Sequence, residues 1–213
     1  MMIEQRTLDE CRNKKVLHVG ALGDWKRFIK ENKISDWSYV SIKRVAESVI
    51  AIDIDEPGIS AMRKRGFDIE YGDIEDLNLK KKFDVIFCGD VIEHLNNIGL
   101  FFDSCKRHMH EESVLIISTN NPYSANMIMH SLLGTVHKGI YFDHTTLLYE
   151  NNILLFAKRY GLDVKSVDYF TLIDYRSKWL VVTSYAIKLL GVLCKSYNTS
   201  YNVRLTLGGK RNV

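Results

Sequence analysis

Short apolar runs alternate along the chain with longer amphipathic segments, which is the pattern of a largely parallel β-sheet connected by helices. Several runs are apolar at consecutive positions, as expected for strands covered on both faces of a sheet. Apolar residues recur at helical spacing in three segments, 56–65, 98–108 and 150–160. We predict strands at 15–19, 48–53, 67–71, 83–89, 113–119, 164–170 and 203–207.

Two stretches depart from this alternation. Residues 24–47 are longer than one crossover helix requires, and we predict two short helices there. Residues 174–202 insert a long helix before the last strand, giving one domain over 1–213 with a helical insertion. On that helix the residues outside the apolar majority fall on one narrow stripe, which comprises Ser177, Ser184, Lys188, Gly191 and Lys195.

The stripe can be interpreted in several ways. The simplest is that the 177–195 helix packs on its own domain or on a twin subunit in a homodimer. A lid over a site and a helix lying on a membrane surface are the alternatives. The apolar stretch at 179–194 is shorter than the roughly 20 residues needed to span a bilayer, and it contains Lys188.

Composition narrows the function classes. The net charge of +3 is too small to argue for nucleic acid by itself. The four cysteines form no CxxC pair, which favours a reducing compartment over a disulfide framework. The first fifteen residues contain no apolar core of a secretory signal. We therefore expect a cytoplasmic protein.

Polar residues follow the first two strands at the points where each strand ends. In an open α/β sheet, ligands bind just beyond the carboxyl ends of the strands. Gly20 and Gly23 would let the backbone turn tightly and approach a ligand. Asp53 ends the second strand, where a carboxylate can accept both hydroxyls of a ribose, although it could instead merely begin the next turn. We predict that Asp55 caps the helix that follows.

The most informative stretch is FDVIFCGDVIEHL at 83–95, where an apolar strand ends at Gly89-Asp90 and is followed at once by Glu93 and His94. It resembles the fourth-strand motif of class I S-adenosylmethionine (SAM)-dependent methyltransferases, FDxVxxxxVIEHL. The pieces AIDID at 51–55 and GDIEDL at 72–77 occur in the order of that family. The resemblance covers about residues 15–167.

The resemblance implies a Rossmann-like, doubly wound, seven-stranded mixed sheet with the last strand antiparallel and helices on both faces. It also implies SAM as the cofactor, with Asp53 on the ribose, Asp73 on the exocyclic amine of adenine and Ile74 as an apolar wall. Asp90 and Val91 would lie beside the methionine part. The resulting prediction for the cofactor site is Gly20, Ala21, Asp53, Ile54, Asp73, Ile74, Asp90 and Val91.

The first turn departs from the family pattern D/E-x-G-x-G-x-G. His18 stands in place of the acid, Leu22 in place of the second glycine and Asp24 in place of the third. The form VLHVGALGDW is similar to a variant subgroup of SAM methyltransferases that begins with a VLHxG turn.

Methyl transfer from a sulfonium is an in-line displacement from an activated donor, so the protein mainly orients the reactants. A hydroxyl acceptor must also lose its proton, and a positioned base then contributes about 10²–10⁴-fold. His94 and His144 are the candidate bases, although His94 could instead serve structure. His108 and His110 alone do not make a metal site, and we predict none.

The leading hypothesis is a SAM-dependent methyltransferase acting on a small-molecule or glycan acceptor. A nicotinamide-dependent oxidoreductase is the first alternative, but Leu22 and Trp25 in the glycine turn count against it. The second alternative is a degenerate methyltransferase fold that binds without catalysis, which His18 and Leu22 keep open.

Overall fold

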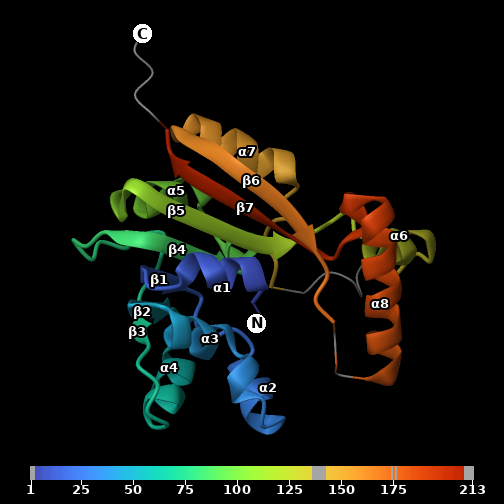
Figure 1. Cartoon of the computed structure of the whole chain (residues 1–213), viewed down its shortest axis with the longest axis horizontal. Coiled ribbons are helices and arrows are strands. Elements are labelled where there is room, and N and C mark those ends of the chain that lie inside the picture. The colour runs from blue at the N-terminus through green and yellow to red at the C-terminus, as the bar shows by residue number, and fades with distance from the viewer. Residues whose placement is uncertain (1–2, 136–142, 174, 176, 209–213) are drawn as a thin grey trace.

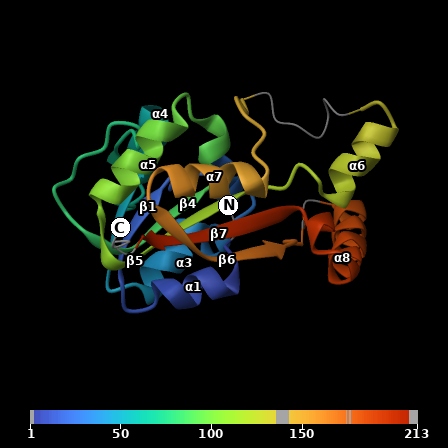
Figure 2. The same cartoon turned by 90° about the horizontal axis from the view of Figure 1, so that it is seen from above.

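The computed structural model describes residues 3–135, 143–173, 175 and 177–208. Its centre is a seven-stranded sheet in the order β3-β2-β1-β4-β5-β7-β6. Strand β7 is antiparallel to both β5 and β6, and the other neighbouring pairs are parallel. Helices α1 and α3 cover one face of the sheet and α5 and α7 the other (Figure 2). The predicted fold class is therefore confirmed.

The strands follow the predicted ranges, except that β5 begins four residues earlier than predicted, β7 begins three residues earlier, and the third strand is shortened to two residues. Phe67 donates its N–H to Met62 at the end of a helix, and the N–H of Asp68 donates to the Tyr39 hydroxyl. These backbone groups are therefore not available to a neighbouring strand, so only two residues pair. The strands are β1 Lys15–Val19, β2 Ser48–Asp53, β3 Glu70–Tyr71, β4 Phe83–Gly89, β5 Met109–Asn120, β6 Leu162–Phe170 and β7 Ser200–Leu207.

The helices confirm two of the predictions made for the crossovers. The long crossover between β1 and β2 contains two short helices, α2 and α3, as predicted, and Asp55 caps α4 by accepting from the N–H of Gly58 at 3.1 Å. Helices α1 and α6 were not predicted. None of the helices in the described part of the chain is long and apolar enough to cross a membrane. The α-helices are α1 Gln5–Cys11, α2 Trp25–Lys30, α3 Ser38–Val45, α4 Glu56–Arg63, α5 Ile98–Arg107, α6 Ala125–Leu132, α7 Glu150–Arg159 and α8 Lys178–Leu193.

A buried cation ties the N-terminal helix to the far half of the sheet. The side chain of Arg204, on β7, is fully buried and contacts Glu10 and Asp168 at 2.6 Å each and Glu4 at 3.2 Å. Glu4 immediately precedes α1, Glu10 lies on α1, and Asp168 lies on β6. Removing one partner of such a network would leave an uncompensated buried charge, which is strongly destabilising.

His18, which replaces the acid of the first motif, lies inside the sheet. It is 1% exposed, its ring centroid is 5.3 Å from that of Phe87, and its Nδ1 has no hydrogen-bond partner. Burial lowers the pKa of His18 to about 3. The imidazole is therefore neutral at physiological pH and contributes to the core as an aromatic side chain.

The low pKa of His18 predicts acid lability. Below an unfolded pKa of about 6.5 the unfolded chain binds a proton that the folded protein does not bind until about pH 3, so stability is lost as the pH falls between these values. Between pH 7 and pH 5 this costs about 2 kcal/mol. We expect His18→Leu to remove that part of the pH dependence, measured by urea unfolding at both pH values. His130→Leu, outside the core, is the control and should keep the wild-type difference.

Candidate active site

A cleft of about 770 Å³ opens at the carboxyl ends of β1, β2 and β4. Every residue of the predicted cofactor site lines it except Ala21, which is fully buried behind it. The backbone of Ala21 is held there, since its N–H donates to Ile52 and its carbonyl accepts from the Trp37 indole. Both predicted bases, His94 and His144, also line the cleft.

The turn after β1 brings backbone close to the end of β4. Gly20 has φ of +69°, and a Cβ at this position would overlap the Cγ2 atom of Val91. Only glycine fits there, both in conformation and in space. Leu22, in place of the second family glycine, is 2% exposed and packs in an apolar cluster that includes Phe28 and Trp37. The altered turn is thus held by apolar packing as well as by a close backbone approach.

Asp53 joins this turn to the end of β2. Its Oδ2 accepts from the N–H of Leu22 at 2.9 Å, and its Oδ1 accepts from the N–H of Asp55 at 3.1 Å. A carboxylate has about four lone-pair sites, so each oxygen keeps capacity for a further donor. Asp73, after β3, is exposed in the cleft and accepts from the N–H of Glu75, while its neighbour Ile74 is buried and apolar.

Asp90 ends β4 with a strained backbone, φ of +51°, and its N–H donates to Ser118 at 2.9 Å. The side chain is open to solvent through the cleft, although protein surrounds its deeper part and raises its pKa.

Glu93 lies beneath the cleft and was not predicted as a site residue. It is 2% exposed, and its Oε2 has no hydrogen-bond partner. Burial, and then the nearby Asp90, raise the pKa of Glu93 to about 8. Its buried position was not visible in the sequence, because the segment after β4 forms a single 3-10 turn, η2 (Ile92–His94), before α5 begins.

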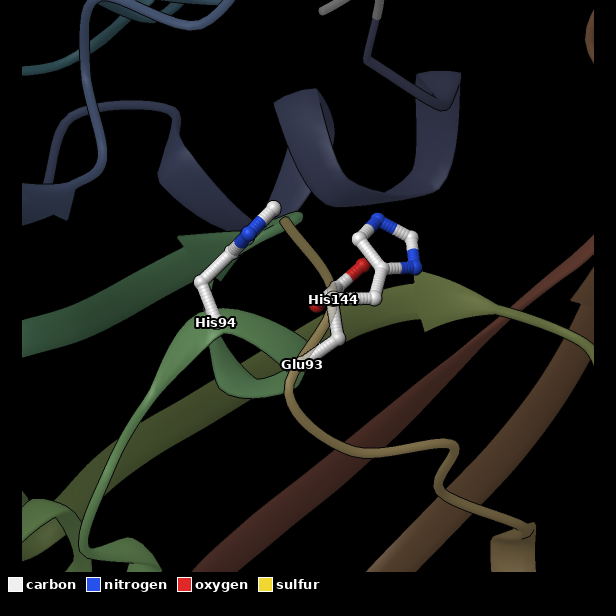
Figure 3. Close-up of side chains that lie close together, drawn as sticks. All are labelled: Glu93, His94 and His144. Carbon is white, nitrogen blue, oxygen red and sulfur yellow. The ribbon is translucent and has the colours of Figure 1, made fainter. Parts of the chain in front are cut away.

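Glu93, His94 and His144 converge although they come from two segments (Figure 3). One ligand atom from each residue lies within 4.8 Å of the others, and the two imidazole centroids are 4.8 Å apart. The loop with His144 is held by the Glu93 carbonyl, which accepts from the N–H groups of Thr145 and Thr146. A carboxylate and two imidazoles can transfer a proton. The same side chains can also act as ligands of a divalent cation.

The two histidines are held differently. His94 Nδ1 lies 3.1 Å from the Asp143 carbonyl oxygen, an arrangement in which Nδ1–H donates and Nε2 is left as the basic atom. Burial, and then the charge of His94, lower the pKa of His144.

The charges lining the cleft favour a cationic ligand. The acidic side chains there include Asp24, Asp53, Asp73 and Asp90, whereas among the described lining residues Arg27 is the one lysine or arginine. Arg27, at the start of α2, pairs with Asp24 at 3.2 Å. Arg27 was not among the site residues predicted from the sequence.

Known proteins resemble this chain in both sequence and fold. Residues 36–117 match the family profile of a methyltransferase domain. The chain also aligns with a SAM-dependent methyltransferase from Archaeoglobus fulgidus at a TM-score of 0.61 and 16% identity, covering 95% of this chain and 90% of that one. An S-adenosylmethionine-dependent methyltransferase from Mesorhizobium loti aligns at a TM-score of 0.60 and 15% identity, covering 94% of this chain and 94% of that one. The fold is that of SAM-dependent methyltransferases.

Sequence relatives carry the likeness over a shorter range. A ubiquinone biosynthesis O-methyltransferase from Nitrobacter winogradskyi is 30% identical over 84 residues, 37% of this chain and 32% of that protein. The protein of the same name from Rickettsia akari is 26% identical over 141 residues, 64% of this chain and 56% of that protein. The chain thus spans between a third and just over half of the length of these curated relatives.

Proposed function

We propose that this protein transfers a methyl group from SAM to a hydroxyl of a small-molecule acceptor. The observation that carries the proposal is the joint placement, in one cleft, of the Asp53, Asp73 and Asp90 carboxylates with the His94–His144 pair. The methyltransferase-domain match and the names of the O-methyltransferase relatives support it.

The cofactor would lie along the carboxyl ends of the strands. Asp53 would accept hydrogen bonds from the ribose hydroxyls, and Asp73 would accept one from the exocyclic amine of adenine. Ile74 would pack on the adenine ring. Gly20, which permits close backbone approach, and Val91 flank the methionine part. Arg27 binds the cofactor carboxylate. Because SAM carries a sulfonium and an ammonium against one carboxylate, its net charge of +1 complements the acidic lining.

The acceptor would enter beside His94 and His144. His94 Nε2 would take the proton of the acceptor hydroxyl, and SAM, when bound, would supply the activated methyl group to that oxygen. The proton would remain on the imidazolium, which Asp143 and the ionised form of Glu93 would stabilise.

The first test is incubation with SAM and a panel of phenols, aliphatic alcohols and sugars, with S-adenosylhomocysteine release as the readout. We expect turnover with at least one hydroxyl acceptor. Turnover on sugars alone would place the acceptor among glycans. SAM binding with no turnover on any acceptor would contradict the proposal and favour a non-catalytic module, and binding of NADH in place of SAM would favour an oxidoreductase.

The raised pKa of Glu93 predicts that SAM binding releases a proton. At pH 7 a group with a pKa of about 8 is mostly protonated, and the sulfonium entering beside Asp90 favours the ionised form of the Asp90–Glu93 pair. We expect release of up to about one proton. Calorimetry in buffers of different ionisation enthalpy measures it. S-adenosylhomocysteine, which has no sulfonium, should release far less, and equal release by Glu93→Gln and the wild type would contradict the assignment.

A further inference from the structure

Two helices stand beyond the carboxyl edge of the sheet as a separate appendage. Helix α6 follows β5, and α8 lies between β6 and β7, so both are anchored at the edge where Asn120 pairs with Ser200. Figures 1 and 2 show the two helices side by side and away from the helices that cover the sheet. We call residues 125–132 and 178–193 the α6–α8 appendage.

The appendage exposes its apolar side chains and buries its small ones. Ser184 and Gly191 are buried on α8, where a Cβ on Gly191 would overlap Asn198. The stripe noted in the sequence therefore faces the domain at these two positions. Trp179 is 74% exposed, Leu193 81% and Leu132 78%. Other exposed apolar residues of the appendage are Ile128, Met129, Val182, Tyr185, Leu189, Leu190 and Val192.

A helix normally turns its apolar face inward, and a large contiguous apolar patch on a protein surface marks an interaction site. The patch on the appendage comes from both helices and includes aromatic and long aliphatic side chains. The exposed apolar face of the appendage is therefore a candidate interaction site.

The charges around the patch distinguish the candidate occupants. Neither 122–138 nor 175–198 contains an Asp or Glu, and Lys178, Lys188 and Lys195 are exposed. A second copy joined through this face would place Lys178 in the contact, with no carboxylate on α6 or α8 to pair it. An anionic surface instead complements all three, and Trp179 and Tyr185 are residue types that concentrate at the interface between membrane and water.

We propose that the α6–α8 appendage binds the surface of a membrane that contains anionic lipids. Helix α8 has sixteen residues and is about 24 Å long, shorter than the roughly 30 Å hydrocarbon core, so it lies in the membrane plane. Its outward apolar side chains enter the acyl boundary, and the three lysines contact lipid headgroups. The proposal does not depend on methyl transfer.

The experiment is co-sedimentation of the full chain with vesicles of phosphatidylcholine alone and with about one third phosphatidylglycerol, an anionic fraction that gives each nearby lysine about fivefold in partitioning. We expect the wild type to bind the anionic vesicles at least tenfold more tightly and to be released by salt. The combined variant Trp179→Ser, Leu189→Ser, Leu193→Ser should lose binding. The control, Tyr71→Ser, Leu155→Ser, Val164→Ser, changes exposed apolar residues outside the appendage and should bind normally.

Circular dichroism and S-adenosylhomocysteine binding establish that each variant is folded. The variant Lys178→Glu, Lys188→Glu tests the charge separately and should lose the preference for anionic vesicles. Absence of wild-type binding, or equal loss in the control variant, would overturn the proposal. A dimer at low micromolar concentration that the Trp179 variant dissociates, without vesicle binding, would assign the face to a second copy and would also overturn it.

Discussion

Asp53→Ala is expected to weaken binding of both SAM and S-adenosylhomocysteine by at least about 100-fold. The substitution removes the acceptor for two ribose hydroxyls, and charge-assisted hydrogen bonds of this kind contribute about 1.5–3 kcal/mol each. It also leaves the N–H of Leu22 and of Asp55 without their acceptor, which loosens the glycine turn. Isothermal titration calorimetry gives both dissociation constants directly.

Two further variants separate recognition from folding. Asp76→Ala changes an exposed carboxylate of the following turn that does not line the cleft, and it should bind as the wild type does. Asp53→Asn keeps an oxygen for one backbone donor, so its glycine turn should be better preserved while the affinity still falls. Wild-type affinity in Asp53→Ala would contradict the placing of the ribose.

His94→Asn is expected to lower kcat by about 10²–10⁴-fold on a hydroxyl acceptor while leaving SAM affinity nearly unchanged. The asparagine amide can still donate to the Asp143 carbonyl, as Nδ1 does, but it has no atom equivalent to the basic Nε2. Initial rates of S-adenosylhomocysteine release at saturating SAM, from pH 6 to pH 9, measure the effect. His130→Asn, on α6, is the matched control. An unchanged kcat would show that His94 does not take the proton.

The same measurement distinguishes the two uses of the Glu93–His94–His144 cluster. If these side chains act as a proton acceptor and its support, preincubation with EDTA leaves the wild-type rate intact. If they hold a divalent cation that binds the acceptor oxygen, EDTA abolishes the rate and added Mg²⁺ or Zn²⁺ restores it. We expect the first result, because the His94–Asp143 hydrogen bond already orients His94 as a base.

Strand ends were the part of the site most open to prediction from sequence. Asp53 and Asp90 stand at the ends of the apolar runs of β2 and β4, and parallel strands present those ends at one edge, whereas Asp73 was predicted through the resemblance of GDIEDL to the methyltransferase family. Ala21 is adjacent to Gly20 in sequence but turns away from the cleft, because the positive φ at Gly20 reverses the chain before it.

Glu93 and Arg27 needed the three-dimensional arrangement. Whether Glu93 is solvated or buried depends on a single 3-10 turn and on a loop about 50 residues later, and neither leaves a local pattern. Arg27 lies in the short helix α2, WKRFIK, and six residues are too few to show which way each side chain of a helix points. In the sequence, Arg204 is only a charged residue within an apolar strand. Its partners Glu4 and Glu10 are nearly 200 residues away and are identified only in the folded structure.

The order of the strands has a consequence for biosynthesis. Strand β7 is the last of the seven to be made, yet it lies between β5 and β6 in the sheet. Until residues 200–207 leave the ribosome, β5 has an unpaired edge, β6 has no neighbouring strand, and Glu10 of α1 has no Arg204 to bind. A nascent chain that stalls before this strand should therefore expose unpaired strand edges, which favour aggregation. It should depend on chaperones until β7 is made.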